Sequence, residues 1–301
     1  MMTYTWYQWI LFFFIYCFFG WIFESAYVSL RQHHFVNRGF LRLPMLPLYG
    51  TGAVMMLWVS LPVRDNLFLV YVAGVVAATA LEYVTGWCME RLFKMKYWDY
   101  SNQRFQLHGY ICLSSSIAWG FLTIFLTEVI HNPVEHLVLS IPFRADMAII
   151  LIVGSLFIAD TIQSVKAALD LGKTLEAITR IRGEVEELQT RLEELKSAAE
   201  TQTAELREQA ELLATGLKEN AAQKLAEFQE DINQRLEDDF PELNARLHAL
   251  LEYRHSLSEK LGTYRAGLIR RNPTASSARF NEALKELKEY LEELKDSRKQ
   301  E

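Results

Sequence analysis

Long apolar segments in the first half of the chain constrain its fold more than any other feature of the sequence. Five of them approach or exceed the roughly 20 residues that a helix needs to cross the hydrocarbon core of a bilayer. They occupy residues 4–30, 45–61, 67–93, 109–130 and 147–168. Because lipid offers no hydrogen bonds to the backbone, such segments fold as helices. The sequence therefore predicts an all-α, polytopic membrane bundle of about five transmembrane helices.

The second apolar segment is the weakest of the five. Pro44, Pro47 and Pro62 bracket it, and Gly50 and Gly52 lie near its start. Proline interrupts a helix except in its first turn, and glycine weakens a helix wherever it lies. This segment is predicted to form a short or re-entrant helix.

A change in composition at about Leu171 predicts the main domain boundary. Residues 1–170 contain the apolar segments and are predicted to form a transmembrane helical domain. Residues 171–301 are rich in Glu, Lys, Arg, Gln, Leu and Ala, as expected for long solvated helices. We predict a cytoplasmic coiled-coil or helical-hairpin arm in this second part.

Apolar residues in the arm recur at the alternating spacing of three and four that is typical of a coiled coil. The first stripe starts at Val185, is interrupted at residues 216–217 and resumes over 221–236; further stripes follow Pro241 and begin at Phe280. Each stripe needs a partner, because an isolated amphipathic helix leaves its apolar face in water. Either the second helix folds back on the first, or two chains pair as a homodimer, and the sequence leaves both open.

Arginine and lysine in the connections predict the orientation, because cytoplasmic loops are enriched in them. The connections after the first, third and fifth segments are basic, whereas the opposite ones contain only Arg64 and Arg144. We therefore expect a multi-pass plasma-membrane protein with its N-terminus outside and its arm in the cytoplasm. The first segment lacks a basic start and is too long for a cleaved signal peptide, so it is expected to remain as an anchor.

Four carboxylates in the predicted transmembrane helices are candidates for a membrane polar site. They are Glu24, Glu82, Glu90 and Asp160. All four are predicted in the cytoplasmic half of the bilayer, where a carboxylate is costly unless it is paired or hydrated. Glu82 lies about two helical turns from the nearest loop and is therefore a functional candidate. For Glu24 and Glu90 we expect pairing with Arg31 and Arg91 in the headgroup region.

Two loops on the same side supply further candidates. Residues 37–53 contain two prolines, three glycines, Arg38 and Arg42, which fits either a cavity lining with an anion site or a tight connector. Directly before the fourth apolar segment, the candidate loop site comprises Trp98, Asp99, Tyr100, Ser101 and His108. Aromatic side chains are typical of the membrane interface, but this role does not account for the charged ones. We predict that this loop caps a polar cavity that the helices enclose.

Several classes of function are disfavoured by the sequence. The net charge of −6 and the lack of a basic stripe argue against nucleic-acid binding. The three cysteines and the scattered histidines do not have the spacing of a disulfide framework or a metal site, so no cofactor or metal is predicted. The chain has no phosphate-binding loop of the GxxxxGK[ST] type, so it is not expected to hydrolyse ATP by itself.

Four stretches of sequence, in this order, resemble the putative ABC-transporter type IV family, also called CmpB-like. They are "GWIFES", "RGFLRLPMLPLYGTGA", "LEYVTGWCMERLF" and "YWDYSNQRFQLHGYICLSSSIAWG". The resemblance implies an integral protein of bacterial plasma membranes that is named as a transporter component. The positions carried over are Glu24, Gly39, Pro44, Pro47, Tyr49, Gly50, Glu82, Gly86, Glu90, Trp98, Asp99, Tyr100, Ser101, Gly109 and Trp119.

Three functions fit these observations. The first is a transporter or permease component, dimeric in the lipid bilayer, in which inward-facing carboxylates line a path and a separate ATPase subunit supplies any ATP hydrolysis. The second is a membrane-anchored scaffold or sensor that binds lipid or protein and recruits cytoplasmic proteins through the coiled coil. The third is an intramembrane enzyme acting on a lipid head group, with Glu82 or His108 as base and Arg38 or Arg42 holding a phosphate. The resemblance favours the first.

Overall fold

The computed structural model describes residues 4–214 and 241–300, which are almost entirely helical. Two compact units are present. Unit 1 comprises Met1–Lys173 together with Gly262–Glu301, and unit 2 comprises Thr174–Leu261. The predicted all-α class is confirmed, since the only strands in the described part of the chain are the two-residue β1 (Gln106–Leu107) and β2 (Ile111–Cys112).

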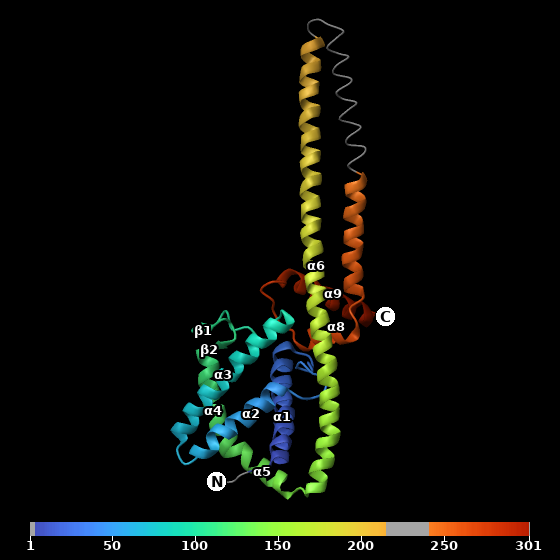
Figure 1. The fold of residues 1–301 in the computed structure, drawn as a ribbon. Coiled ribbons are helices and arrows are strands. Elements are labelled where there is room, and N and C mark those ends of the chain that lie inside the picture. The colour runs from blue at the N-terminus through green and yellow to red at the C-terminus, as the bar shows by residue number, and fades with distance from the viewer. Residues whose placement is uncertain (1–3, 215–240, 301) are drawn as a thin grey trace. The chain divides into compact units, whose positions relative to one another are not determined.

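Four helical stretches that begin in unit 1 are long and apolar enough to cross a membrane (Figure 1). The first two are α1 (Trp6–Gln32) and α3 (Leu67–Phe93). The third is continuous through α4 (Leu113–Phe125), the π-helical turn η2 (Leu126–Ile130) and α5 (His131–Ser140). The fourth is the first part of α6 (Phe143–Ala214), a helix that continues past the predicted boundary at residue 170 without a break.

The second apolar segment forms a short helix, α2 (Pro47–Ser60), followed by the 3₁₀ turn η1 (Leu61–Val63). Its 14 residues rise about 21 Å, less than the roughly 30 Å of a hydrocarbon core. Pro47 occupies the first turn, where a missing N–H costs nothing. The prolines thus explain both the start and the shortness of α2, and the number of spans stays a prediction.

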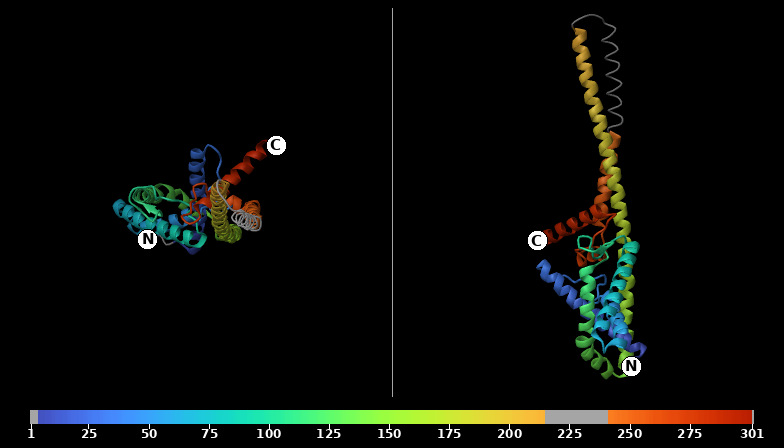
Figure 2. Two further views of the ribbon diagram at one scale, coloured as in Figure 1. Left: turned by 90° about the horizontal axis from the view of Figure 1, so that it is seen from above. Right: turned by 90° about the vertical axis from the view of Figure 1, so that its left-hand side faces the viewer.

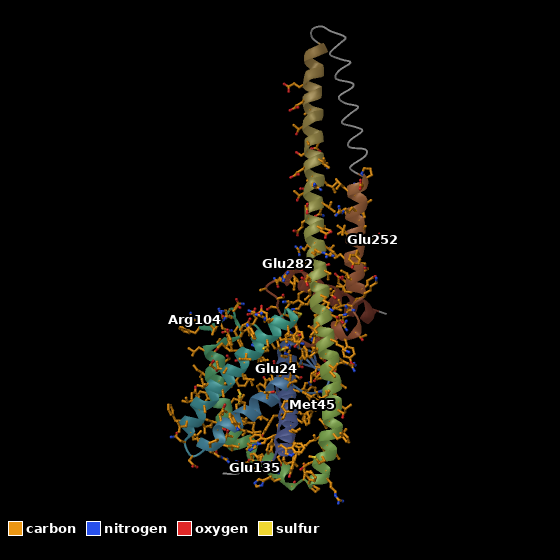
Figure 3. All side chains as sticks on the ribbon, viewed as in Figure 1. Glu24, Met45, Arg104, Glu135, Glu252 and Glu282 are labelled. Atoms are coloured by element: carbon orange, nitrogen blue, oxygen red, sulfur yellow. The ribbon has the colours of Figure 1, made fainter. Side chains whose placement is uncertain are left out.

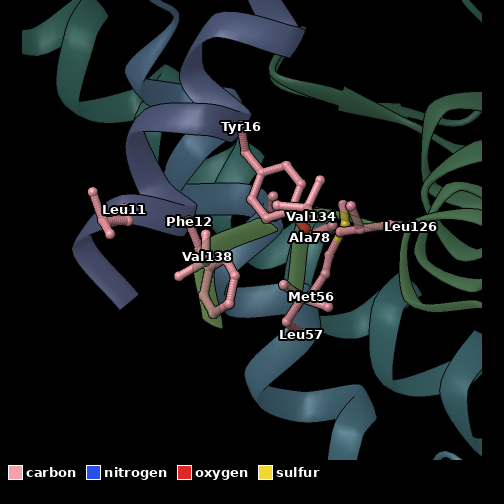
Figure 4. Packing of buried hydrophobic residues seen from close by; sticks show 10 residues of the cluster. Leu11, Phe12, Tyr16, Met56, Leu57, Ala78, Leu126, Val134 and Val138 are labelled. Carbon is pink, nitrogen blue, oxygen red and sulfur yellow. The ribbon is translucent and has the colours of Figure 1, made fainter. Parts of the chain in front are cut away.

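Close packing between the helices of unit 1 depends on small residues. Figure 4 shows a buried cluster that brings together side chains from α1, α2, α3, η2 and α5. Around it, a Cβ atom built on Gly20 would lie 2.3 Å from the Cβ of Tyr49, and one on Gly74 would lie 2.2 Å from Oγ1 of Thr123. Helices in lipid associate through such close approaches, because the hydrophobic effect does not drive them together there.

The C-terminal segment belongs to unit 1, whereas its composition predicted that it belongs to the arm. It contains α8 (Thr263–Arg271) and α9 (Asn281–Gln300). Between these helices, the backbone of Ser276 exchanges two hydrogen bonds with Lys96, just after α3, at N···O distances of 2.8 and 2.9 Å. Ser277 Oγ donates to the Lys94 carbonyl at 2.7 Å. Figures 1 and 2 show α8 and α9 at the end of unit 1 where α3 terminates.

Unit 2 contains the second part of α6 and a helical stretch over residues 241–259. Along α6, buried side chains recur at spacings of three and four, namely Leu175, Ile178, Ile181, Val185 and Leu188. Ion pairs such as Arg182–Glu186, at 3.0 Å, lie on the exposed face. Because both stretches belong to one compact unit, a fold-back within one chain is compatible with the geometry. The predicted interruption at 216–217 and the stripe over 221–236 lie outside the described residues.

Candidate functional site

Glu82 on α3 is buried, and three neutral donors surround its carboxylate. The Tyr100 hydroxyl donates to Oε1 at 3.1 Å, while Trp119 Nε1 and Ser115 Oγ donate to Oε2 at 2.9 and 3.4 Å. The side chain is 5% exposed, and the ion pairs found in the described part of the chain do not include it. A buried carboxylate without a basic partner is stable only when it binds a proton, a cation or further donors. Such a group is chemically available for a ligand.

Arg38 forms the second polar centre, and all of its guanidinium donors are used. Nε donates to Glu24 Oε1 at 3.3 Å, and Glu24 in turn accepts from the Tyr49 hydroxyl at 2.8 Å. Nη1 and Nη2 complete the set with four acceptors: the carbonyls of Arg271 and Tyr97, Asn272 Oδ1 and Thr274 Oγ1, at 3.0–3.3 Å. A guanidinium has five N–H groups, so an anion at Arg38 would have to displace one of these partners.

The C-terminal segment in turn donates hydrogen bonds to the loop that contains Arg38. Arg271 donates to the carbonyls of Gly39 and Phe40 at 3.3 and 3.4 Å, and Asn272 Nδ2 donates to the Gly39 carbonyl at 3.1 Å. Gly39 has a φ of +138°, a conformation that side-chain-bearing residues rarely adopt. The loop after α1 and the segment after α8 therefore form one hydrogen-bonded layer.

Each polar centre lines one of two adjoining cavities. The first, of about 260 Å³, is lined by Glu24, Arg38, Tyr49, Tyr97 and Asn272 among others. The second, of about 200 Å³, is mostly apolar and contains Tyr16, Tyr49, Glu82 and Trp119 in its wall. Both share Leu48, Tyr49 and Leu81. Tyr97, which is 5% exposed, lines the first cavity with a buried hydroxyl that has no partner among the described residues.

Comparison with known protein families gives a match for the membrane half of the chain. The family model described as putative ABC-transporter type IV matches residues 11–165, just over half of the chain and all the helices that bound the cavities. The chain belongs to the putative ABC-transporter type IV family. It is therefore a membrane protein related to ABC transporters, as its sequence resemblance implied. Among curated proteins and among solved structures, no significant match was found.

In this type IV family protein, Asp160 on α6 fixes the loop after α1. Its Oδ2 accepts the backbone N–H groups of Arg42 and Leu43 at 2.8 and 2.9 Å. Arg42 itself lies over the ring of Tyr264 in α8, 4.3 Å from the ring centroid. Asp160 and Arg42 thus hold the loop in place, and neither lines the two cavities.

The loop between α3 and α4 folds through its own polar side chains. Asp99 Oδ1 accepts from the backbone N–H and the hydroxyl of Ser101, and Oδ2 accepts from Ser276 Oγ at 3.0 Å. Burial raises the pKa of Asp99, but the hydrogen bonds from Ser101 and Ser276 outweigh it, so that its pKa lies below its usual value. Asp99 and Ser101 therefore shape the loop and attach the C-terminal segment to it.

The other candidates in this loop lie around the turn that joins β1 to β2. Trp98 Nε1 donates to the Tyr110 carbonyl at 2.9 Å, and His108 contacts the Tyr83 hydroxyl through Nδ1 at 3.2 Å. His108 and Gly109 both have positive φ, and a Cβ on Gly109 would lie 2.6 Å from Asp99 Oδ1. Of the predicted loop residues, only Tyr100 reaches Glu82, and only Trp98 lines a cavity.

The expected ion pairs of Glu24 and Glu90 are wrong. Glu24 pairs with Arg38, fourteen residues along the chain, and not with Arg31. Glu90 accepts from the Tyr110 hydroxyl at 2.5 Å, while Arg91 lies over the Trp87 ring. The four predicted carboxylates thus divide into two at the cavities, Glu24 and Glu82, and two that hold loops.

A second buried cluster, at the other end of unit 1, was missed by sequence reasoning. His131 is fully buried, with Nδ1 2.8 Å from the Tyr16 hydroxyl and Nε2 2.9 Å from that of Tyr4. Tyr4 also donates to Glu135 at 2.5 Å. The spacing of four between His131 and Glu135 was a signal for it, because such residues share one face of a helix. Their aromatic partners, however, lie more than a hundred residues away in sequence.

Proposed function

We propose that this protein is a permease component of a membrane transporter whose solute binds at the two adjoining cavities. The main evidence is Glu82, a buried carboxylate in the wall of a mostly apolar cavity. Three neutral groups donate to it, and it has no basic partner in the described part of the chain. In the neighbouring cavity Glu24 adds an acceptor, and the Tyr97 hydroxyl, which has no partner among the described residues, adds a donor. Family membership supports the transporter assignment.

The chemistry of the cavities favours a cation or a solute rich in hydrogen-bond donors. Both carboxylates that line the cavities are acceptors when ionised. The guanidinium of Arg38 has no free N–H group, so it offers no binding site for an anion unless a partner leaves. This saturation also weakens the alternative of a lipid head-group enzyme, which needs Arg38 to hold a phosphate.

The protein is proposed to be multi-pass in the plasma membrane, with five spans of which α2 is a short one. The distribution of basic residues supports an N-terminus outside and the loops after α1 and α3 in the cytoplasm. In this orientation the cavity that contains Glu24 lies toward the cytoplasm. Unit 2 is proposed to be a coiled-coil arm, and a homodimer and a separate ATPase subunit remain the expected partners, because the sequence has no phosphate-binding loop.

Ligand-induced thermal stabilisation tests the proposal. Purified protein in mild detergent is titrated with sodium, potassium, choline, ethanolamine and methylammonium chlorides while its Tm is followed by intrinsic fluorescence. A ligand that binds only the folded state raises the Tm by mass action. At least one of these cations is expected to raise the Tm of the wild type, and the rise is expected to vanish in Glu82→Gln.

Glu128→Gln is the matched control, because Glu128 pairs with Arg64 at 3.0 Å and lines neither cavity. This variant should keep the cation-induced rise in Tm. Wild-type protein that responds to none of the cations, or a Glu82→Gln variant that responds like the wild type, would contradict the proposal.

A scaffold or sensor is the second candidate, and one observation favours it. The chain leaves unit 1 at Lys173 and rejoins it at Gly262, so that unit 2 is attached to unit 1 through two chain segments. An arm with two attachments can report an event in unit 2 to the loops of unit 1. Cross-linking of the intact protein in cells should then capture a partner on residues 241–259, and a membrane domain that is fully active without that partner would argue against this function.

A further inference from the structure

The apolar cavity beside Glu82 has walls whose residues are exposed on the outside of the helix bundle. One wall is α1 and the other is the stretch from α4 through η2, while α2 and α3 supply the residues between them. Phe23 of the α1 wall is 64% exposed, and Phe125 of the α4 wall is 50% exposed. On helices of membrane length, large exposed apolar side chains contact lipid. The cavity therefore has a side that faces the hydrocarbon of the bilayer.

The shape of this cavity suits one narrow chain. Its wall on the α4 side extends from Trp119 to Ile130, a helical rise of about 16 Å. Its volume of about 200 Å³ is nevertheless below the roughly 300–1,000 Å³ of pockets that hold drug-sized ligands. A length of several helical turns with so small a volume fits a single alkyl chain better than a bulky solute.

Gly52 on α2 shows where free space lies along the cavity wall. It is buried, yet among the described residues a Cβ atom built on it would meet only Leu81, whose Cδ2 lies 3.8 Å away. Gly20 on the α1 wall differs, because Tyr49 fills the space beside it. Since Gly52 lines the cavity, the room next to it is part of the cavity.

Glu82 gives this apolar cavity a polar end. No basic side chain in the part of the chain that the structure describes pairs with it, so a cation would balance its charge. Trp119, which donates to Glu82, lines the same cavity with an aromatic ring, a surface that attracts ammonium groups. Figure 3 shows Glu24, which lines the adjoining cavity, closer to the end of unit 1 that carries Arg104 than to the end that carries Glu135. The polar groups thus lie toward the loops.

We propose that the solute is a cationic amphiphile, with an ammonium head group at Glu82 and a single alkyl chain in the apolar cavity. The proposal rests on the proposed transport function and adds to it the chemical class of the solute. Charge complementarity selects the head group, because an anionic or uncharged head would leave a buried carboxylate unpaired. The exposed wall residues select the chain, because an amphiphile dissolves in the bilayer and reaches the cavity from its lipid-facing side.

Thermal stabilisation by a matched series of ligands tests this assignment. Full-length protein in mild detergent is titrated with tetramethylammonium, butyltrimethylammonium and octyltrimethylammonium chlorides while its Tm is followed by intrinsic fluorescence. In water, each buried methylene strengthens binding about fourfold, and uptake of the ligand by micelles lowers this gain. From the methyl to the octyl compound, the concentration that gives the same rise in Tm is expected to fall by about tenfold or more.

Two ligands with the same octyl chain separate the effect of charge from that of chain length. Octanol is uncharged and octanesulfonate is anionic, so neither brings a cation to Glu82. Both are expected to raise the Tm less than octyltrimethylammonium does, and Glu82→Gln should respond to none of the ammonium salts. A rise with octanol or octanesulfonate that equals the rise with octyltrimethylammonium would overturn the cationic head group.

A matched pair of glycine variants tests where the chain binds. Gly52→Leu places a side chain in the cavity and leaves the donors of Glu82 unchanged, so it should respond to octyltrimethylammonium no more than to tetramethylammonium. Gly154→Leu on α6 is the control, because a Cβ atom there also has its nearest neighbour 3.8 Å away and Gly154 lines neither cavity. This variant should keep the wild-type gain with chain length.

The results separate the amphiphile from the transport proposal. An octyl chain that adds nothing in the wild type, or a Gly52→Leu variant that keeps the wild-type gain, overturns the amphiphile, and if Gly52→Leu fails to fold, the wild-type series decides. If small cations raise the Tm through Glu82 while the chain adds nothing, the solute site stands without the amphiphile. If only octyltrimethylammonium raises the Tm, and does so through Glu82 and Gly52, the amphiphile stands and the site for small cations is wrong.

Discussion

At the scale of single residues, Arg38 connects three separate parts of unit 1. Its five N–H groups reach acceptors on α1, on the loop after α3 and on the segment after α8. A lysine has only three donors, arranged around one nitrogen, so it cannot satisfy the same five acceptors. Position 38 therefore requires an arginine, because only a guanidinium can donate to all five acceptors.

Arg38→Lys is expected to destabilise unit 1 by about 2 kcal/mol, because buried acceptors lose their donors. The thermal midpoint in detergent should fall by roughly 4–8 °C. Arg31→Lys, at an exposed position near the end of α1, is the control and should leave the midpoint unchanged. An Arg38→Lys midpoint equal to that of the wild type would show that the five hydrogen bonds contribute nothing to stability.

Asp99 is expected to make the attachment of Ser276 to its loop depend on pH. Its folded-state pKa lies below the unfolded value of about 3.9. Its ionised form therefore stabilises the attachment of Ser276 above that value, and this contribution is lost as the pH falls through the lower folded-state pKa. Hydrogen exchange at the amide of Ser276 should accelerate, beyond the intrinsic effect of pH, when the protein is acidified below about pH 4. In Asp99→Asn the acceleration should be present already at neutral pH.

At the scale of elements, helix pairs in unit 1 touch through positions that tolerate no side chain. Gly74 on α3 faces Thr123 on α4, and a methyl carbon added to this glycine would lie 2.2 Å from Oγ1. For a methyl carbon added to Gly154 of α6, the nearest atom is 3.8 Å away. The two positions therefore differ in whether they can accommodate a side chain. The first permits close approach of helices, while the second has room for a methyl group and would gain helix propensity from alanine.

Gly74→Ala is expected to cost about 1–3 kcal/mol through the shift that it forces on α4. Gly154→Ala should be neutral or slightly stabilising. The comparison is made on thermal midpoints of the two purified variants in the same detergent. Equal midpoints would mean that α3 and α4 can separate without penalty.

The presence of the apolar helices was largely predictable from the sequence, whereas some of their ends and the contacts between distant segments were not. Apolar runs of membrane length, Pro47 at the start of α2 and Asn66 as the N-cap of α3 are local signals. The pairing of Glu24 with Arg38, by contrast, depends on how the loop after α1 folds back, and the expected partner Arg31 was only nearer in sequence. In the His131 cluster, the spacing of His131 and Glu135 is a local signal, but the two tyrosines at and before α1 are distant in sequence and no local pattern identifies them.

At the scale of the whole molecule, the segment after residue 261 belongs structurally to the membrane domain. A chain that ends at residue 261 would lose three of the five acceptors of Arg38 and keep only Glu24 and the Tyr97 carbonyl. Truncation and Arg38→Lys therefore act on the same hydrogen bonds. Their effects on the thermal midpoint should be far from additive, because the interaction that the second change removes is already gone.

The measurement is a double-mutant cycle in which Arg38→Lys is introduced into both the full-length and the truncated protein. Arg31→Lys in the same cycle should be additive with the truncation. Full additivity of Arg38→Lys would mean that the C-terminal segment does not bind the Arg38 loop in solution.

Because Arg38 is far along the chain from several of its acceptors, it is synthesised well before them. Arg38 meets Asn272 and Thr274 across 234 and 236 residues. At about 5–20 residues per second, translation needs on the order of 10–50 s to produce them after Arg38 itself has been made. During that interval the Arg38 guanidinium and the carbonyls of Gly39 and Phe40 lack the partners that the C-terminal segment supplies. The set of hydrogen bonds around Arg38 is thus incomplete until residue 274 has been translated, and a chain that stalls earlier leaves these buried polar groups without partners.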